Sequence, residues 1–140
     1  RTPDDTVYLA DCLSGRETLD KYRIGFIYDV AAYLDTLERM KGMTAKTFVP
    51  AHAAACGEIA ELAQYNIDKV NEVQGDILAL CDKPRSFDEV LKALFDRYGL
   101  TMNFEQYALV GSTVRSYLTW LKKAGRLQAE FVDNRLLFQA

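Results

Sequence analysis

The chain has 140 residues, enough for one ordinary domain or two very small ones, and 49% of them are apolar, which excludes an intrinsically disordered protein. Its formal net charge of −3 argues against a dedicated nucleic-acid binder with a basic surface. No apolar run is long enough to cross a membrane, the first residues lack the apolar core of a signal peptide, and three cysteines are too few for a disulfide framework, so we expect a cytoplasmic protein.

The first part of the chain alternates between short strand patterns and helix patterns. We expect a strand over residues 6–10, a polar loop through Gly15 and Gly25, a helix over 27–41, a strand over 47–49 ended by Pro50, and a long helix over 54–80. The order of strand, helix, strand and helix predicts an α/β unit.

The second part of the chain predicts a different arrangement. Ser86 and Glu89 have capping-box spacing at the start of a helix that ends at Gly99. We expect a short helix over 104–109, a turn at Gly111-Ser112, a helix over 112–124, and a hairpin of residues 127–132 and 135–139 around Asp133-Asn134. Helix, helix, turn, helix and hairpin is the order of a winged helix.

The boundary between the two parts is expected at a polar stretch, Cys81-Asp82-Lys83-Pro84-Arg85. Residues 1–83 carry 9 Lys and Arg against 14 Asp and Glu, a net of −5, whereas residues 84–140 carry 8 against 6, a net of +2. Composition and pattern therefore predict two modules, residues 1–83 and 84–140.

Two residues of the type that binds metal follow the two expected strands. Asp11 comes directly after the first strand, and His52, the only histidine, follows the second. Because a βαβ crossover makes the strands parallel, both residues should lie at the same edge of the sheet, where α/β folds build their sites. A carboxylate and an imidazole are good ligands for zinc, iron or manganese. Without further ligands, the same pair could also be a helix cap and a surface histidine.

Three segments carry a resemblance to a known family: VYLADCLSG, IYDVAAYLDTLERMKG and KTFVPAHAAAC. Over roughly residues 4–80 they resemble the C-terminal half of the metallo-β-lactamase fold superfamily, in which one strand ends in Gly-Asp and a later one in Pro-Gly-His-Gly. The resemblance implies that Asp11 matches the aspartate that bridges two metals and that His52 matches the last histidine ligand. Some of these hydrolases also carry a C-terminal winged helix.

The fold implied for this chain is α+β and helix-rich: half of an αββα sandwich followed by a winged helix. The chain differs from the family pattern at Ala10, Ala51 and Ala53, where the family usually has glycine, and it lacks the family's His-x-His-x-Asp-His motif. We therefore expect the C-terminal part of a metal-dependent hydrolase, inactive alone, whose missing N-terminal half supplies the other ligands. The exposed apolar surface of such a fragment should cause self-association.

Alternatives remain open at three places. A local metal site of Asp11, His52 and Cys56 is conceivable. The stretch from Lys21 to Arg23 would lie in the loop after Asp11 and either contact an anionic substrate or be solvated. The substrate could be a thioester, a lactam-like ring, a phosphodiester or another ester, because nothing in the sequence selects among them.

The competing function is a winged-helix module that binds nucleic acid or another protein. The helix before the hairpin would enter a groove, with polar side chains available for RNA or DNA at Arg115, Ser116, Thr119, Lys122 and Lys123. Glu130 and Asp133 on the hairpin would face the same phosphates, and a net charge of +2 is small for binding to the backbone. A domain that only packs on the hydrolase is the alternative.

Overall fold

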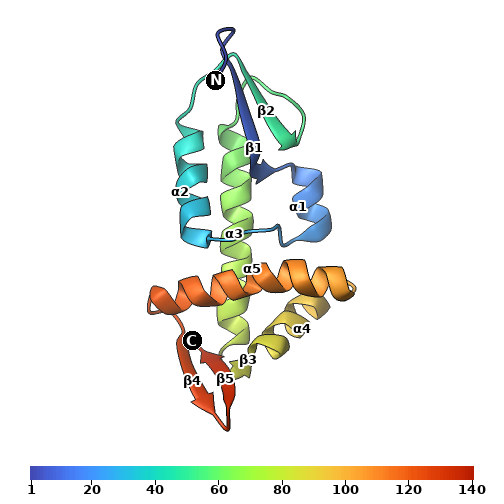
Figure 1. Ribbon diagram of the computed structural model, residues 1–140, viewed down its shortest axis with the longest axis vertical. Helices are drawn as coiled ribbons and strands as arrows, with labels where there is room; N and C mark the ends of the chain where they lie inside the picture. The colour runs from blue at the N-terminus through green and yellow to red at the C-terminus, as the bar shows by residue number, and fades with distance from the viewer. The chain divides into compact units, whose positions relative to one another are not determined.

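The structure, a computed structural model, describes residues 1–140. The elements in chain order are β1 (Thr6–Ser14), α1 (Arg16–Tyr22), α2 (Val30–Lys41), β2 (Thr47–His52), α3 (Ala60–Leu80), β3 (Arg85–Ser86), α4 (Phe87–Tyr98), α5 (Phe104–Lys123), β4 (Gln128–Val132) and β5 (Arg135–Gln139) (Figure 1). Helices predominate and the sheets are small, so the prediction of a helix-rich α+β chain is confirmed. None of the helices combines the length and the apolar character that crossing a bilayer requires.

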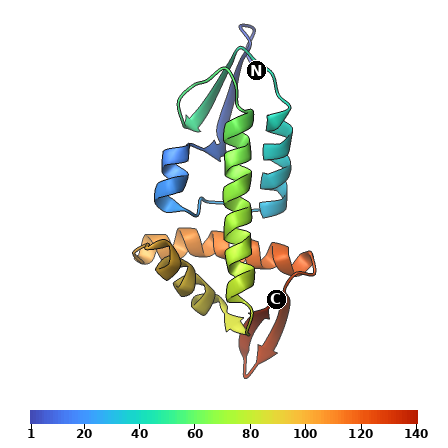
Figure 2. The same cartoon turned by 180° about the vertical axis from the view of Figure 1, so that it is seen from behind.

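The chain divides into two compact units. Residues 1–25 and 31–70 form the first unit, and residues 26–30 and 71–140 form the second. Helix α3 is continuous (Figure 2) and contributes its first half to one unit and its second half to the other. A compact unit need not fold independently, so the predicted domain boundary between residues 83 and 84 stays a prediction.

In the first unit, β1 and β2 form a parallel two-stranded sheet, as the expected βαβ crossover requires. Helices α2 and α3 pack on this sheet because their apolar positions recur at helical spacing and meet the inward-facing residues of both strands. One cluster of buried side chains joins the four elements and the residue just before α3: Val7, Leu9, Leu13, Leu37, Met40, Phe48, Ile59, Ala63 and Ile67. Leu9 and Leu13 of this core come two residues before and after Asp11 in β1.

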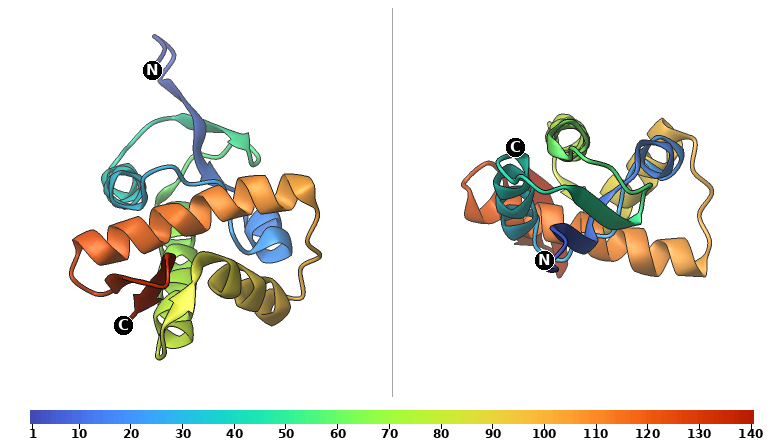
Figure 3. Two further views of the ribbon diagram at one scale, coloured as in Figure 1. Left: turned by 60° about the horizontal axis from the view of Figure 1, so that its bottom comes forward. Right: turned by 90° about the horizontal axis from the view of Figure 1, so that it is seen from above.

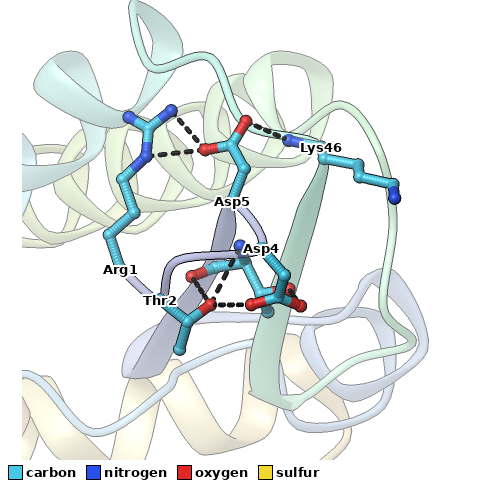
Figure 4. A network of polar contacts seen from close by, with 6 residues as sticks. Arg1, Thr2, Asp4, Asp5 and Lys46 are labelled. Atoms are coloured by element: carbon cyan, nitrogen blue, oxygen red, sulfur yellow. Dashed lines mark hydrogen bonds and ion pairs between the residues drawn. The ribbon is translucent and has the colours of Figure 1, made fainter.

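A polar network ties the beginnings of the two strands together (Figure 4). Asp5, which precedes β1, accepts a hydrogen bond of 2.7 Å from Arg1 Nε through Oδ1 and one of 3.0 Å from the Lys46 backbone N–H through Oδ2. The Lys46 N–H also donates to the Asp5 carbonyl over 3.1 Å. These bonds place the start of β2 beside the start of β1 and so set the first pair of the register, Thr6 opposite Thr47.

In the second unit, three short antiparallel strands follow the order β3-β5-β4. The capping box predicted at Ser86 and Glu89 is present at the start of α4, and Gly99 ends this helix with a left-handed φ of 64°. The hairpin is also confirmed: Asp133 and Asn134 both have positive φ, as a two-residue turn between antiparallel strands requires. The winged-helix interpretation of this region stays a prediction.

The predicted break at Gly111-Ser112 is wrong, because α5 is one uninterrupted helix (Figure 3). Gly111 is buried inside this helix, and a Cβ atom there would lie 3.3 Å from Cζ of Phe87 on α4. The glycine therefore allows close packing of α5 against α4 and does not make a turn.

Two further expectations in the first unit are wrong. The predicted loop after the first strand contains the helix α1, whose one buried residue, Leu19, gives no periodic signal. The long helix begins at Ala60 and not near residue 54. Before it, Phe48 and Cys56 exchange two backbone hydrogen bonds of 2.7 Å and 3.0 Å, so the chain through Cys56 is extended and cannot be helical.

Candidate metal centre

The end of β1 is irregular where Asp11 lies. The strand pairs regularly with β2 through Tyr8, but its register shifts between Tyr8 and Ala10 and again between Ala10 and Ser14. Ala10 has a φ of 47°, a conformation that side chains other than glycine rarely adopt. Asp11 therefore follows the regular part of the strand, although it lies inside β1 and not after it as predicted. His52 is the last residue of β2, so this strand runs past Pro50, where it was expected to end.

The structure brings the two predicted ligands together. The Nε2 atom of His52 lies 2.9 Å from Oδ1 of Asp11. Both side chains are open to solvent, with 64% of the His52 side chain and 80% of the Asp11 side chain exposed. The inference from parallel strands, that both residues lie at one edge of the sheet, is therefore consistent with the geometry. Whether they bind metal stays a prediction.

A buried amide holds the backbone behind this pair. Asn66 on α3 accepts a hydrogen bond of 3.0 Å from the Ser14 N–H and donates one of 3.0 Å to the Ser14 carbonyl. Ser14 pairs with His52 in the sheet register, and the next residue, Gly15, donates its N–H to the His52 carbonyl over 3.3 Å. The sequence did not indicate this role of Asn66, since nothing local reveals a partner 52 residues away.

The two donors fit a metal ion in kind but not in number. Two ligands of one zinc ion at a tetrahedral angle lie about 3.4 Å apart. The 2.9 Å between Asp11 Oδ1 and His52 Nε2 is the distance of a direct ion pair, so the two atoms would move apart by about half an ångström to hold an ion between them. A catalytic zinc site needs about three protein ligands and a water, and no group of three His, Cys, Asp or Glu side chains is arranged to hold a metal. The alternative local site of Asp11, His52 and Cys56 is therefore wrong: the Cys56 backbone is bound to Phe48, and its thiol completes no ligand group.

An open cavity of about 480 Å³ adjoins His52. Its lining includes Arg16 and Thr18 of α1 and Glu61 of α3. The Arg16 guanidinium stacks on the ring of Tyr65, 4.4 Å from its centroid. The Tyr65 hydroxyl donates a hydrogen bond to Asp20, which lowers the pKa of the Asp20 carboxyl and raises the pKa of the Tyr65 phenol. These contacts fix α1 on α3 beside His52.

The residues from Lys21 to Arg23 are not in a loop. Lys21 and Tyr22 form the end of α1, and Arg23 is its C-terminal cap with a φ of 63°. The Lys21 ammonium lies 4.9 Å from the centroid of the Tyr22 ring. None of the three is among the residues that line the cavity beside His52.

All five residues predicted to contact nucleic acid lie on α5. The Arg115 guanidinium stacks on Phe87 at 3.5 Å from the ring centroid, and the Ser116 hydroxyl donates to the Tyr28 carbonyl over 2.8 Å. Thr119, Lys122 and Lys123 are exposed. Two of the five therefore already have partners within the chain.

No protein-family model matches the sequence, and a search of curated proteins finds no match. Solved structures do match. A beta-lactamase domain protein from Burkholderia ambifaria is 17% identical with a TM-score of 0.76, over 97% of this chain and 41% of that one. A metallo-beta-lactamase family protein from Thermus thermophilus is 15% identical with a TM-score of 0.73, over 98% of this chain and 42% of that one.

The matches extend beyond residues 4–80, where the sequence resemblance lies, to nearly the whole chain. The chain spans about two fifths of the length of each matched protein. At such low identity the likeness concerns the fold alone. The chain therefore has the fold of the corresponding part of metallo-β-lactamase-fold proteins.

Proposed function

We propose that the chain is part of a metal-dependent hydrolase of the metallo-β-lactamase superfamily, to which it contributes Asp11 and His52 as metal ligands. The observation that carries this proposal is the separation of 2.9 Å between Asp11 Oδ1 and His52 Nε2. The two residues are far apart in sequence, and each lies where one of the paired parallel strands ends or loses its regular pairing.

The chemistry follows from the donor types. When bound, zinc, iron or manganese would supply Lewis acidity, which lowers the pKa of a water molecule so that hydroxide is available near neutral pH to attack an ester or a related bond. Asp11 would hold the ion through its carboxylate, and His52 would hold it through Nε2. The cavity beside His52 would admit the substrate, and its wall carries one guanidinium, Arg16, and three carboxylates, Glu17, Glu58 and Glu61.

The remaining ligands would come from a segment outside this chain. The chain covers 41% and 42% of the matched structures, which supports a longer functional protein. The partner of this chain is then the rest of the hydrolase domain. Self-association of the isolated chain stays a prediction: sedimentation should show dimers or larger species at high concentration, and a clean monomer would contradict it.

For the second unit we propose a winged-helix module attached to the hydrolase domain. The order of elements supports this: the second half of α3 is followed by the short strand β3, helices α4 and α5, and the hairpin. The sheet order β3-β5-β4 supports it as well. Nucleic-acid binding is not favoured, because Arg115 and Ser116 have internal partners and Glu130 lies on β4.

The test compares the longer protein, with its upstream sequence, to the 140-residue chain. We expect stoichiometric metal and hydrolysis of an ester or phosphodiester in the longer protein, and neither in the chain alone. Asp11→Ala and His52→Ala should each lower the metal content and the rate, because each removes a ligand. Asp35→Ala, on α2, serves as a control that removes an exposed carboxylate elsewhere in the first unit.

Elemental analysis of the purified variants gives the metal content, and the hydrolysis assay gives the rate. Metal content unchanged in both ligand variants would contradict the assignment of Asp11 and His52. A stoichiometric and active metal site in the 140-residue chain would contradict the requirement for a further segment.

A further inference from the structure

Asn66 is a fully bonded polar side chain in the core of the first unit. Only 1% of this residue is exposed. Besides its two bonds with Ser14, its Nδ2 donates to the Leu62 carbonyl over 2.8 Å and its Oδ1 accepts from the Tyr33 hydroxyl over 3.0 Å. A buried amide costs free energy unless it is hydrogen-bonded, and asparagine is a poor helix former. Its hydrogen bonds, and not apolar packing or helix propensity, therefore account for an asparagine at position 66.

The hydrogen bonds of Asn66 lie where the pairing between β1 and β2 is irregular. The register between β1 and β2 fails between Ala10 and Ser14, so strand pairing does not fix this segment. Asn66 instead binds both backbone groups of Ser14, as a neighbouring strand would do. Asp11 lies inside the irregular segment, and Ser14 at its end pairs with His52. The amide thus holds both the segment that carries Asp11 and the partner of His52.

Tyr33 on α2 orients this amide. Its hydroxyl donates to Asn66 Oδ1, the same oxygen that accepts from the Ser14 N–H, so this bond reinforces the orientation in which the oxygen faces Ser14 N–H and the NH₂ group faces the Ser14 carbonyl. Burial raises the pKa of the Tyr33 phenol to about 12, with a smaller contribution from Cys12. Tyr33 therefore keeps its proton and remains a donor throughout the physiological range.

We propose that Asn66, oriented by Tyr33, is the positioning residue of the Asp11–His52 pair. It acts through the backbone of Ser14 and does not touch either ligand. The proposal rests on the proposed function insofar as the pair binds metal, but the positioning itself can be measured without metal.

The metal-free test uses His52, because it gives the only histidine signals in the spectrum of the 140-residue chain. Asp11→Asn should shift the His52 imidazole resonances, since the two side chains are 2.9 Å apart. In an Asn66→Leu background, which keeps the number and branching of the side-chain heavy atoms but removes the hydrogen bonds of the amide, we expect this shift to fall to less than half. Ile67→Val, a buried change at the next position, is the control and should leave the shift intact.

Tyr33→Phe provides a second variant in case Asn66→Leu does not fold. It removes only the hydroxyl that orients the amide, so the response of His52 to Asp11→Asn should be weakened, though less than by Asn66→Leu. An undiminished response in Tyr33→Phe and in every folded Asn66 variant would overturn the proposal. A response lost equally in Ile67→Val would also overturn it, because general loosening of the core would then explain the effect.

The metal test uses the longer protein and zinc as the probe. Substitution of residues that support metal ligands typically lowers metal affinity by about 10- to 100-fold. Asn66→Leu should therefore weaken zinc binding by about tenfold, and Ile67→Val should leave it unchanged. Zinc affinity that depends on Asp11 and His52 but not on Asn66 would overturn the positioning role alone. Zinc affinity that depends on neither ligand would reject the proposed function, while the spectra would still decide the positioning role.

Discussion

The two strand pairs of this molecule differ in how regularly they are built. The hairpin of β4 and β5 keeps an unbroken register from Gln128 to Val132, and its positive φ angles lie at a turn of Asp133 and Asn134. The parallel pair of β1 and β2 shifts register twice, and its positive φ falls on Ala10, within a strand. The irregular pair carries the candidate metal ligands. Strain within a strand, held by other contacts, therefore lies at the end of the sheet that carries the candidate ligands.

The largest expected difference between the two strand pairs concerns their aromatic residues. Phe48 on β2 is 1% exposed and Phe131 on β4 is 73% exposed. Phe48→Ala should lower the free energy of unfolding by about 3–5 kcal/mol because it leaves a cavity in the core. Phe131→Ala should change it by less than about 0.5 kcal/mol. Urea denaturation measures both, and comparable losses would show that the hairpin, too, supports a core.

The next prediction concerns the approach of Gly15 to β2. A Cβ at Gly15 would lie 2.9 Å from the His52 carbonyl oxygen, so Gly15→Ala should cost about 1–3 kcal/mol and shift the His52 resonances. Gly75→Ala is the matched control, because Gly75 lies in α3 with no atom within 4 Å of the added Cβ. Gly75→Ala should raise the free energy of unfolding by about 1 kcal/mol, because alanine favours a helix more than glycine does. A neutral Gly15→Ala with unchanged His52 signals would mean that this backbone contact does not hold the site.

A smaller effect of opposite sign is expected at Ala10. Ala10→Gly should remove the cost of about 1–2 kcal/mol that alanine incurs in a left-handed conformation. Glycine is more flexible in the unfolded chain, and this offsets about 0.5–1 kcal/mol of the gain. We therefore expect a net gain of up to about 1 kcal/mol in thermal or urea unfolding. Asn134→Gly in the hairpin turn should be nearly neutral, because asparagine tolerates positive φ.

Ala51→Gly, on β2, is the control for a strand position that has no positive φ. Ala51→Gly should lower the free energy of unfolding by about 0.5–1 kcal/mol. Equal losses at Ala10 and Ala51 would show that the strand is not strained at Ala10.

The smallest effect concerns pH and the start of α4. Hydrogen bonds from the Ser86 backbone and hydroxyl hold the pKa of the Glu89 carboxyl below its ordinary value of 4.5. The stabilisation from this group is therefore full above the ordinary pKa and is lost as the pH falls through the lowered one. Glu89→Gln should flatten that part of the acid-unfolding curve. An identical curve for both proteins would show that the capping box does not contribute to the pH dependence.

Much of the local structure could be predicted from the sequence. The parallel strand pair, the capping box at Ser86 and the turn at Asp133-Asn134 each have a local signal that the structure bears out. The juxtaposition of Asp11 and His52 also followed, because it needs only the geometry of a βαβ crossover.

Several of the wrong predictions share one cause, because long-range packing decided the structure, whereas helix α1 was missed because its one buried residue gives no periodic signal. Gly111 indicates a helix break in the sequence, whereas in the structure it allows Phe87 to pack closely against α5. Residues before Ala60 favour a helix until Cys56 is seen to pair with Phe48. Asn66 gave no signal, because its function lies in bonds to Ser14 that only the fold creates.

The most direct test of the central claim is the zinc affinity of the longer protein in a double-mutant cycle of Asp11→Ala and His52→Ala. If both side chains bind one ion, each single variant should weaken binding by more than about a hundredfold, the upper end for residues that merely support ligands. The double variant should then lose less than the product of the two single effects, because the residues act as a unit. Wild-type affinity in either single variant, or two effects that simply multiply, would contradict the claim.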